Sequence, residues 1–179
     1  MDSLEAVHAR VTEKKPGRQY ATEHLNLALF LRLAAEFQGF CRDLHTDVAL
    51  AIVADLDDFS GAEVHRKLLL SSLRRGRKLD VGNASPGNIG NDFMYLGMTL
   101  WADIKNRYPT KGPRWNAVLE DLNNVRNAVA HSDETKLAIV RTQQPLTLRT
   151  FRTWRRALND AATGFDTVVR SYLEDVTGK

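Results

Sequence analysis

The sequence contains one cysteine, Cys41, among 179 residues. A single thiol cannot form an internal disulfide or a zinc site built from several cysteines, so both are excluded within one copy of the chain. Cys41 falls between Phe40 and Leu44 in an apolar pattern. We therefore predict that its side chain fills space in the core and is not a reactive thiol.

Long apolar runs are absent as well. Neither end of the sequence has the apolar stretch of a signal peptide or a membrane span, so we expect a cytoplasmic protein without a membrane partner. With 43% apolar and 26% charged residues, the chain suits one globular core. We expect a helical domain over residues 19–179, preceded by an accessory arm over residues 1–18.

Sustained alternation of apolar and polar residues, the pattern of a half-buried strand, is missing, and only residues 137–140 suggest a short extended piece. Apolar residues instead recur in steps of three and four. The longest such stripe starts after Thr22 and consists of Phe30, Leu33, Phe37, Phe40, Leu44 and Val48. These patterns predict an all-α fold, an antiparallel bundle of about four to five major helices.

Glycine, proline and small polar residues separate the expected helices. A break is predicted at Asp57, Asp58, Ser60 and Gly61, and residues 82–90, with their glycines and asparagines, are expected to form a loop. The remaining helices are expected over residues 64–73, 93–108, 115–130 and 147–176, with Thr147 as an N-cap.

The formal net charge of +3 is small, but the basic residues are unevenly placed. Two groups of them are candidate RNA-binding residues: Arg74, Arg75, Arg77 and Lys78, and Arg152, Arg155 and Arg156. An anionic partner is one interpretation of these groups, and an ordinary solvated surface is the other.

The segment Arg126-Asn127-Ala128-Val129-Ala130-His131 ends the helix expected over residues 115–130. If Leu122, Val125 and Val129 face the core, Asn127 and His131 face away from it and Arg126 lies at the margin. On one helix Arg126 and His131 are about 140° apart. Both can reach one phosphate only if the helix ends near His131, or if a two-fold dimer places each His131 near the partner's Arg126.

This segment resembles the signature of the HEPN superfamily: an arginine, a polar residue, three further residues and a histidine at the end of a helix in a helical bundle. The resemblance extends to the helix around residues 31–37 and to the one that starts at Thr147, and covers roughly residues 22–176. It implies a metal-independent endoribonuclease without a cofactor, of the kind found in toxin–antitoxin, abortive-infection and CRISPR-linked defence systems. The implied partners are RNA, a second copy of the chain, and an antitoxin or another defence protein.

The resemblance also gives active-site roles to Arg126, Asn127 and His131, and their chemistry suits these roles. Cleavage by the 2′-hydroxyl of RNA requires proton removal, proton donation to the 5′-oxygen and positive charge over the phosphorane. Histidine side chains exchange protons near neutral pH, so His131 is assigned the role of general acid and general base. Arg126 would stabilise the transition state, and Asn127 would orient phosphate or ribose.

Each of these residues also has a structural interpretation. Arg126 could be a surface ion-pair partner, and His131 could be favoured at a helix C-terminus by the macrodipole. Glu36 could support Arg126 across the core, but an ion pair with Arg32 one turn earlier is equally consistent with the sequence. The other histidines are expected to be structural or exposed, and the three tryptophans to lie in the core: His8, His24, His45 and His65, and Trp101, Trp115 and Trp154.

Three functions remain open on the sequence alone. The first is a dimeric ribonuclease, whose free activity would be toxic. The second is a non-catalytic HEPN domain that binds RNA or serves as a scaffold in a defence complex. The third is a helical adaptor in which the motif has no role, and its sign would be a monomer without affinity for RNA.

Overall fold

The computed structural model describes residues 22–56 and 61–178, together with residues 3, 6, 7 and 10. The accessory arm expected over residues 1–18 lies almost entirely outside the described residues, and so does the break expected at Asp57, Asp58 and Ser60. The described residues form helices and contain no strand. The prediction of an all-α fold is therefore confirmed.

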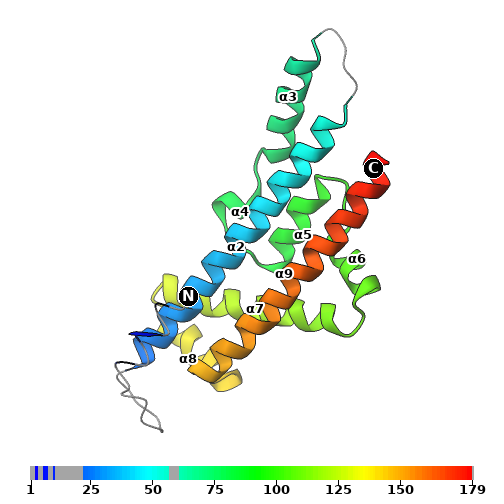
Figure 1. The fold of residues 1–179 in the computed structure, drawn as a ribbon. Helices are drawn as coiled ribbons and strands as arrows, with labels where there is room; N and C mark the ends of the chain where they lie inside the picture. Colours follow the sequence, from blue (N-terminus) through cyan, green and yellow to red (C-terminus); the bar gives the residue numbers. More distant parts are fainter. Residues whose placement is uncertain (1–2, 4–5, 8–9, 11–21, 57–60, 179) are drawn as a thin grey trace.

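Three long helices form the centre of the molecule (Figure 1): α2 (Glu23–Ala54), α7 (Lys111–Ala130) and α9 (Leu148–Thr177). The stripe predicted after Thr22 is buried in α2 except for Phe40, which is partly buried, and Phe30 and Val48 are fully covered. Thr147 caps α9 as predicted, because its Oγ1 accepts a hydrogen bond of 3.2 Å from the Thr150 backbone N–H.

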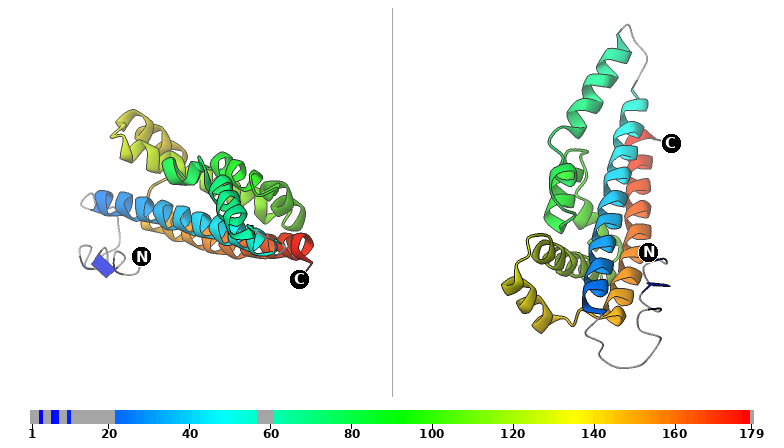
Figure 2. Two further views of the ribbon diagram at one scale, coloured as in Figure 1. Left: turned by 90° about the horizontal axis from the view of Figure 1, so that it is seen from above. Right: turned by 90° about the vertical axis from the view of Figure 1, so that its left-hand side faces the viewer.

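The helices α2 and α9 pack side by side along their lengths (Figure 2). Aromatic residues near the start of α2 contact residues near the start of α9, and residues further along α2 contact residues further along α9. The ring centroids of Phe30 and Phe151 are 5.9 Å apart, and those of Phe37 and Phe165 are also 5.9 Å apart. The two helices therefore run in the same direction, and the expected antiparallel arrangement is wrong for this pair. The rule that short connections give antiparallel neighbours does not apply to them, because α3 to α8 lie between them in the chain.

The helix α7 crosses the α2 and α9 pair and contacts both. Its first half lies against α9, where the ring of Trp115 faces Gly164. Its last turn lies near the start of α2, where Ala128 packs in a small cluster with Leu27 and Leu137. This crossing brings the end of α7, with the predicted site, to the same end of the molecule as the start of α2.

The helix α3 (Ala62–Arg74) follows α2 and packs against it, and the N-terminal part of α3 and the C-terminal part of α2 together extend away from the rest of the fold (Figure 1). The predicted stripe of Val64, Leu68 and Leu73 is only partly buried. Leu73 packs against the core, whereas Val64 is 59% exposed and Leu68 is 66% exposed. This face of α3 is therefore apolar and uncovered in the single chain.

Three short helices follow: α4 (Lys78–Val81), α5 (Pro86–Met94) and α6 (Leu100–Arg107). The loop expected over residues 82–90 is only partly right, because Ser85 caps α5 and Pro86 occupies its first position. The single helix expected over residues 93–108 is wrong. A turn divides it into α5 and α6, and in this turn Gly97 has a φ of 81°, a conformation that glycine adopts most readily.

The extended piece expected over residues 137–140 is also wrong, because these residues belong to α8 (Glu134–Gln143). Asp133 caps this helix, accepting a hydrogen bond of 2.9 Å at Oδ1 from the Lys136 backbone N–H. Leu137 and Val140 are three positions apart and both are buried, so the short apolar stretch is one helical face.

Candidate functional site

The predicted motif forms the last turn of α7 and its cap. Arg126 and Asn127 are half-buried, and His131 is exposed. The helix ends at Ala130, and His131 is its C-cap, with its backbone N–H 3.1 Å from the Asn127 carbonyl oxygen. The motif therefore lies at an accessible helix end, which is one of the two conditions under which Arg126 and His131 could act on one phosphate.

The structure brings the side chains of Arg126 and Asn127 together. The Arg126 guanidinium donates from Nη1 to the Asn127 amide oxygen over 3.1 Å. The same oxygen accepts a second bond of 3.1 Å from Nδ2 of Asn83. No hydrogen bond joins Arg126 to His131 within the described part of the chain, so this turn of α7 holds the arginine and asparagine as one unit, to which His131 is not joined.

The sequence does not predict the contact from Asn83. Residues 82–90 are rich in asparagine, a composition that indicates turns and only a loop. Nothing in the spacing shows that one amide would reach α7, because the contact joins residues 44 positions apart.

Glu36 lies on the exposed face of α2. Its carboxylate accepts a hydrogen bond of 2.8 Å from Nε of Arg32, one turn earlier. This is the second of the two interpretations that the sequence left open. Glu36 is therefore left out of the candidate site.

The candidate RNA-binding residues separate into two places on the fold. Arg74, Arg75 and Lys78 are exposed around the end of α3 and the start of α4. Residues 152–156 lie near the start of α9, where Arg152 and Arg156 are exposed and Arg155 is half-buried. Arg77 is only 5% exposed, and its guanidinium is occupied by contacts within the chain, so it does not offer a surface to RNA.

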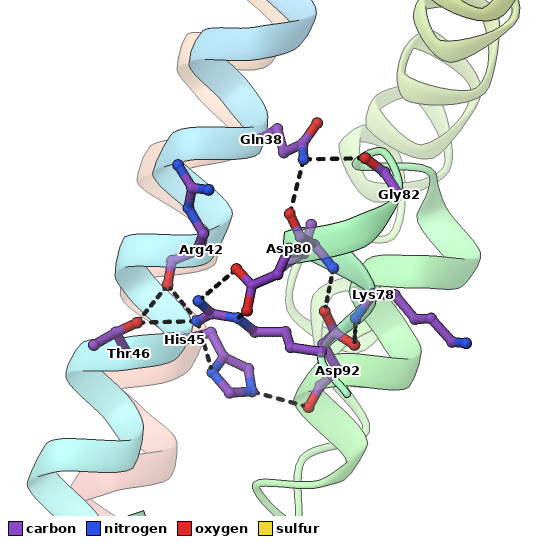
Figure 3. Close-up of polar contacts among 10 residues, drawn as sticks. Gln38, Arg42, His45, Thr46, Lys78, Asp80, Gly82 and Asp92 are labelled. Atoms are coloured by element: carbon purple, nitrogen blue, oxygen red, sulfur yellow. Dashed lines mark hydrogen bonds and ion pairs between the residues drawn. The ribbon is translucent and has the colours of Figure 1, made fainter. Parts of the chain in front are cut away.

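The buried Arg77 is the centre of a polar network that joins the segment after α3 to α2. Figure 3 shows its partners Arg42, Thr46 and Asp80. Its Nη1 donates to the Arg42 carbonyl oxygen and to Thr46 Oγ1, each over 3.0 Å, and its Nε and Nη2 bind the carboxylate of Asp80. The hydrogen bond from Arg77 lowers the pKa of Asp80.

His45 is fully buried in the same network. Its Nε2 lies 3.2 Å from the Asp92 carbonyl oxygen, which can only accept, so Nε2 has the proton. Nδ1 then faces Nη1 of Arg77 at 3.4 Å as an acceptor. Burial, and then the nearby charge of Arg77, lower the pKa of His45. The geometry fits a neutral structural histidine.

A groove of about 560 Å³ lies elsewhere, between α7 and the first turns of α9. Its lining includes Arg114, Asp121 and Arg149, and none of Arg126, Asn127 and His131. Burial, and then the charge of neighbouring Glu120, raise the pKa of Asp121. The motif therefore lies outside this groove, on another part of α7.

The tryptophans lie in or against the core as predicted, with Trp115 and Trp154 buried and Trp101 packed at the edge of the core. Cys41 is also fully buried, and burial raises the pKa of its thiol. The prediction of a core cysteine is confirmed.

Among the residues that the structure describes, no three or more histidine, cysteine, aspartate or glutamate side chains are grouped so that they could hold a metal ion. No helix in these ranges has both the length and the apolar character needed to cross a membrane. Comparison of the chain with family models, curated proteins and solved structures gave no match.

Proposed function

We propose that this protein is a metal-independent endoribonuclease of the HEPN type, with Arg126, Asn127 and His131 as its catalytic residues. The observation that supports this most directly is the joined pair of Arg126 and Asn127 in the last turn of α7, with His131 exposed at the cap of the same helix. An arginine held by a neighbouring amide and an accessible imidazole at the end of the same helix are the groups that cleavage by a 2′-hydroxyl requires.

His131 would move protons at the attacking and leaving oxygens, because imidazole gains and loses a proton near neutral pH. Arg126 would stabilise the negative charge of the phosphorane through two hydrogen bonds to its oxygens. Asn127 would present its amide N–H groups to phosphate or ribose, since its oxygen already accepts two bonds within the chain.

The proposed enzyme is a symmetric homodimer. Five positions separate Arg126 from His131, and the α7 end is exposed in the single chain. A two-fold axis at this end would let each His131 act on a phosphate held by the partner's Arg126. The exposed Arg74, Arg75 and Lys78, and Arg152, Arg155 and Arg156 near the start of α9, would then attract the RNA backbone. In the cell we propose a role in toxin–antitoxin or anti-phage defence, with an antitoxin or defence protein that restrains the activity.

The test is cleavage of an end-labelled RNA by the purified protein in the presence of EDTA. The expected product has a 2′,3′-cyclic phosphate, and DNA of the same sequence stays intact because it lacks the attacking hydroxyl. His131→Ala and Arg126→Ala should each lower the rate by at least about 100-fold. His24→Ala and Arg107→Ala, which remove an exposed histidine on α2 and an exposed arginine on α6, are the matched controls.

A mixture of the two inactive variants tests the composite site. If each site takes its arginine from one copy and its histidine from the other, a mixed dimer of Arg126→Ala and His131→Ala retains one complete site. Random mixing should then restore about a quarter of the wild-type activity. A mixture as inactive as its parents would argue against this arrangement. RNA binding without cleavage by the wild type would instead favour the non-catalytic HEPN function.

A further inference from the structure

Asn83 is held by its own loop with little freedom to turn. Its Oδ1 accepts hydrogen bonds of 3.1 Å from the Ser85 backbone N–H and of 3.1 Å from Nδ2 of Asn88. Its carbonyl oxygen accepts another from Nδ2 of Asn88 over 2.9 Å. These contacts fix which end of the Asn83 amide is the oxygen, and therefore direct its Nδ2 toward Asn127 on α7.

The loop itself is attached to both neighbouring long helices. The buried side chain of Asn123 on α7 donates to the Ala84 carbonyl oxygen over 2.9 Å. From α2, Gln38 donates to the carbonyl oxygens of Leu79 and Gly82, over 2.8 and 3.2 Å (Figure 3). Asn83 therefore reaches α7 from a frame that is fixed on two sides.

The bond from Asn83 determines how the next two side chains are presented. An amide oxygen has two lone pairs, and that of Asn127 accepts from Asn83 Nδ2 and from Arg126 Nη1, each at 3.1 Å. With the oxygen occupied on the protein side, the Nδ2 of Asn127 and the remaining N–H groups of Arg126 are left to bind a ligand. Without Asn83, the Asn127 amide could rotate and the guanidinium would lose a fixed acceptor.

We propose that Asn83 is a positioning residue of the candidate site, which sets the orientation of Asn127 and Arg126 toward the phosphodiester of RNA. This inference rests on the proposed ribonuclease function. Asn83 touches no reacting atom. It acts through the amide of Asn127, and its loss would lower the rate of the chemical step more than the affinity for RNA.

The chain offers a substitution that separates this role from a purely structural one. Asn83→Asp keeps an acceptor for Ser85 and Asn88, so the loop is retained, but it replaces the donor toward Asn127 by a carboxylate oxygen. Asn106→Asp is the matched control. It makes the same substitution at an exposed position of α6 and leaves the bonds of Asn83 in place.

The experiment measures kcat and KM for RNA cleavage, with the melting temperature of each variant. Asn83→Asp should lower kcat by about 10- to 100-fold with less than about a threefold change in KM, whereas Asn106→Asp should keep kcat within about threefold of wild type. In an Asn127→Ala background, Asn83→Asp should cause no further loss, because the residue through which it acts is gone.

Three results would overturn the inference, and they are distinct. If the wild type cleaves RNA and Asn83→Asp retains the wild-type kcat, Asn83 is only a loop residue and the ribonuclease function stands. If the wild type does not cleave RNA, the proposed function fails and the inference fails with it. A loss in Asn83→Asp that persists unchanged in the Asn127→Ala background would also contradict the proposed route.

Discussion

The guanidinium of Arg77 and the carboxylate of Asp80 meet through two parallel contacts, Nε to Oδ2 at 3.0 Å and Nη2 to Oδ1 at 2.8 Å. The arginine side chain is 4% exposed, whereas the aspartate is 40% exposed. The pair therefore joins a buried cation to a carboxylate that water can still reach. This difference in burial determines how much stability the protein should lose when the carboxylate is removed.

Removal of the carboxylate should destabilise the fold considerably. Asp80→Ala leaves the buried guanidinium without its counter-charge, and we expect a loss of about 2–3 kcal/mol, below the usual range for a fully buried pair. Asp166→Ala is the control, since it breaks an ion pair with Arg170 that is exposed on both sides and should change stability by less than about 1 kcal/mol. Urea unfolding of both variants measures the difference, and equal losses would contradict the role of Arg77.

Stability should decrease as the pH falls below about 6.5, the ordinary pKa of histidine. Burial and Arg77 lower the pKa of His45 in the folded protein. Between the ordinary and the lowered pKa the unfolded chain binds a proton that the folded protein does not, so acid favours unfolding. The contribution of neutral His45 is complete above pH 6.5 and is lost as the pH falls through the folded pKa.

Urea unfolding of wild type and His45→Gln at pH 7.5, 6.5 and 5.5 checks this expectation. The charged groups around the ring are Arg77 and Asp80 from the segment after α3, Asp92 on α5, and Arg42 on its own helix. Between pH 7.5 and 5.5 the wild type should lose more stability than His45→Gln, because only the wild type has the buried histidine. Parallel pH profiles for the two proteins would show that another group is responsible.

Substitution by alanine should change the stability of the fold in opposite directions at two glycines of the long helices. A Cβ added at Gly164 would lie 2.5 Å from Cη2 of Trp115, a buried ring with little room to move. Gly164→Ala should therefore destabilise by about 1–2 kcal/mol, despite the better helix propensity of alanine. At Gly39 nothing lies within 4 Å of an added Cβ, so Gly39→Ala should stabilise by about 0.5–1 kcal/mol. Thermal unfolding compares them, and a stabilising Gly164→Ala would refute the packing argument.

The Cys41 thiol should react only when the protein opens. It is fully buried, and burial raises its pKa, so little thiolate is present and no reagent can approach. For a typical domain stability, labelling with a disulfide reagent should be at least about a thousandfold slower than in urea. Ser72→Cys places a thiol at an exposed position of α3 and should react at once under native conditions. Rapid labelling of the wild type would mean that α2 opens locally.

The long helices could be predicted because burial imposes a regular spacing on their apolar residues. The stripes of α2 and α9 extend over many turns, so local irregularities do not hide them. The spacing of apolar residues over 93–108 does not predict the division between α5 and α6, and only Gly97 within that range signals a turn. The Tyr172 hydroxyl on α9 donates to the Leu96 carbonyl oxygen and lies beside Gly97. The spacing of residues within 93–108 cannot reveal that contact with α9.

The candidate site was predictable in part. The motif of Arg126, Asn127 and His131 is continuous in sequence, and the end of its helix was predicted at the right residue. The structural roles of Arg77 and Asn83 were not predictable, and the reason is the same for both. A buried arginine and an exposed one look alike within a basic run, and an asparagine that contacts a distant helix looks like one that only forms a turn.

The parallel packing of α2 and α9 has a consequence for how the chain reaches its folded state. Phe30 and Phe151 are in contact in the core, although more than a hundred residues separate them in the chain. Loop closure over such a distance is slow compared with the local contacts of a simple up-and-down bundle. During synthesis the aromatic face of α2 must therefore stay without its final cover until α9 has left the ribosome.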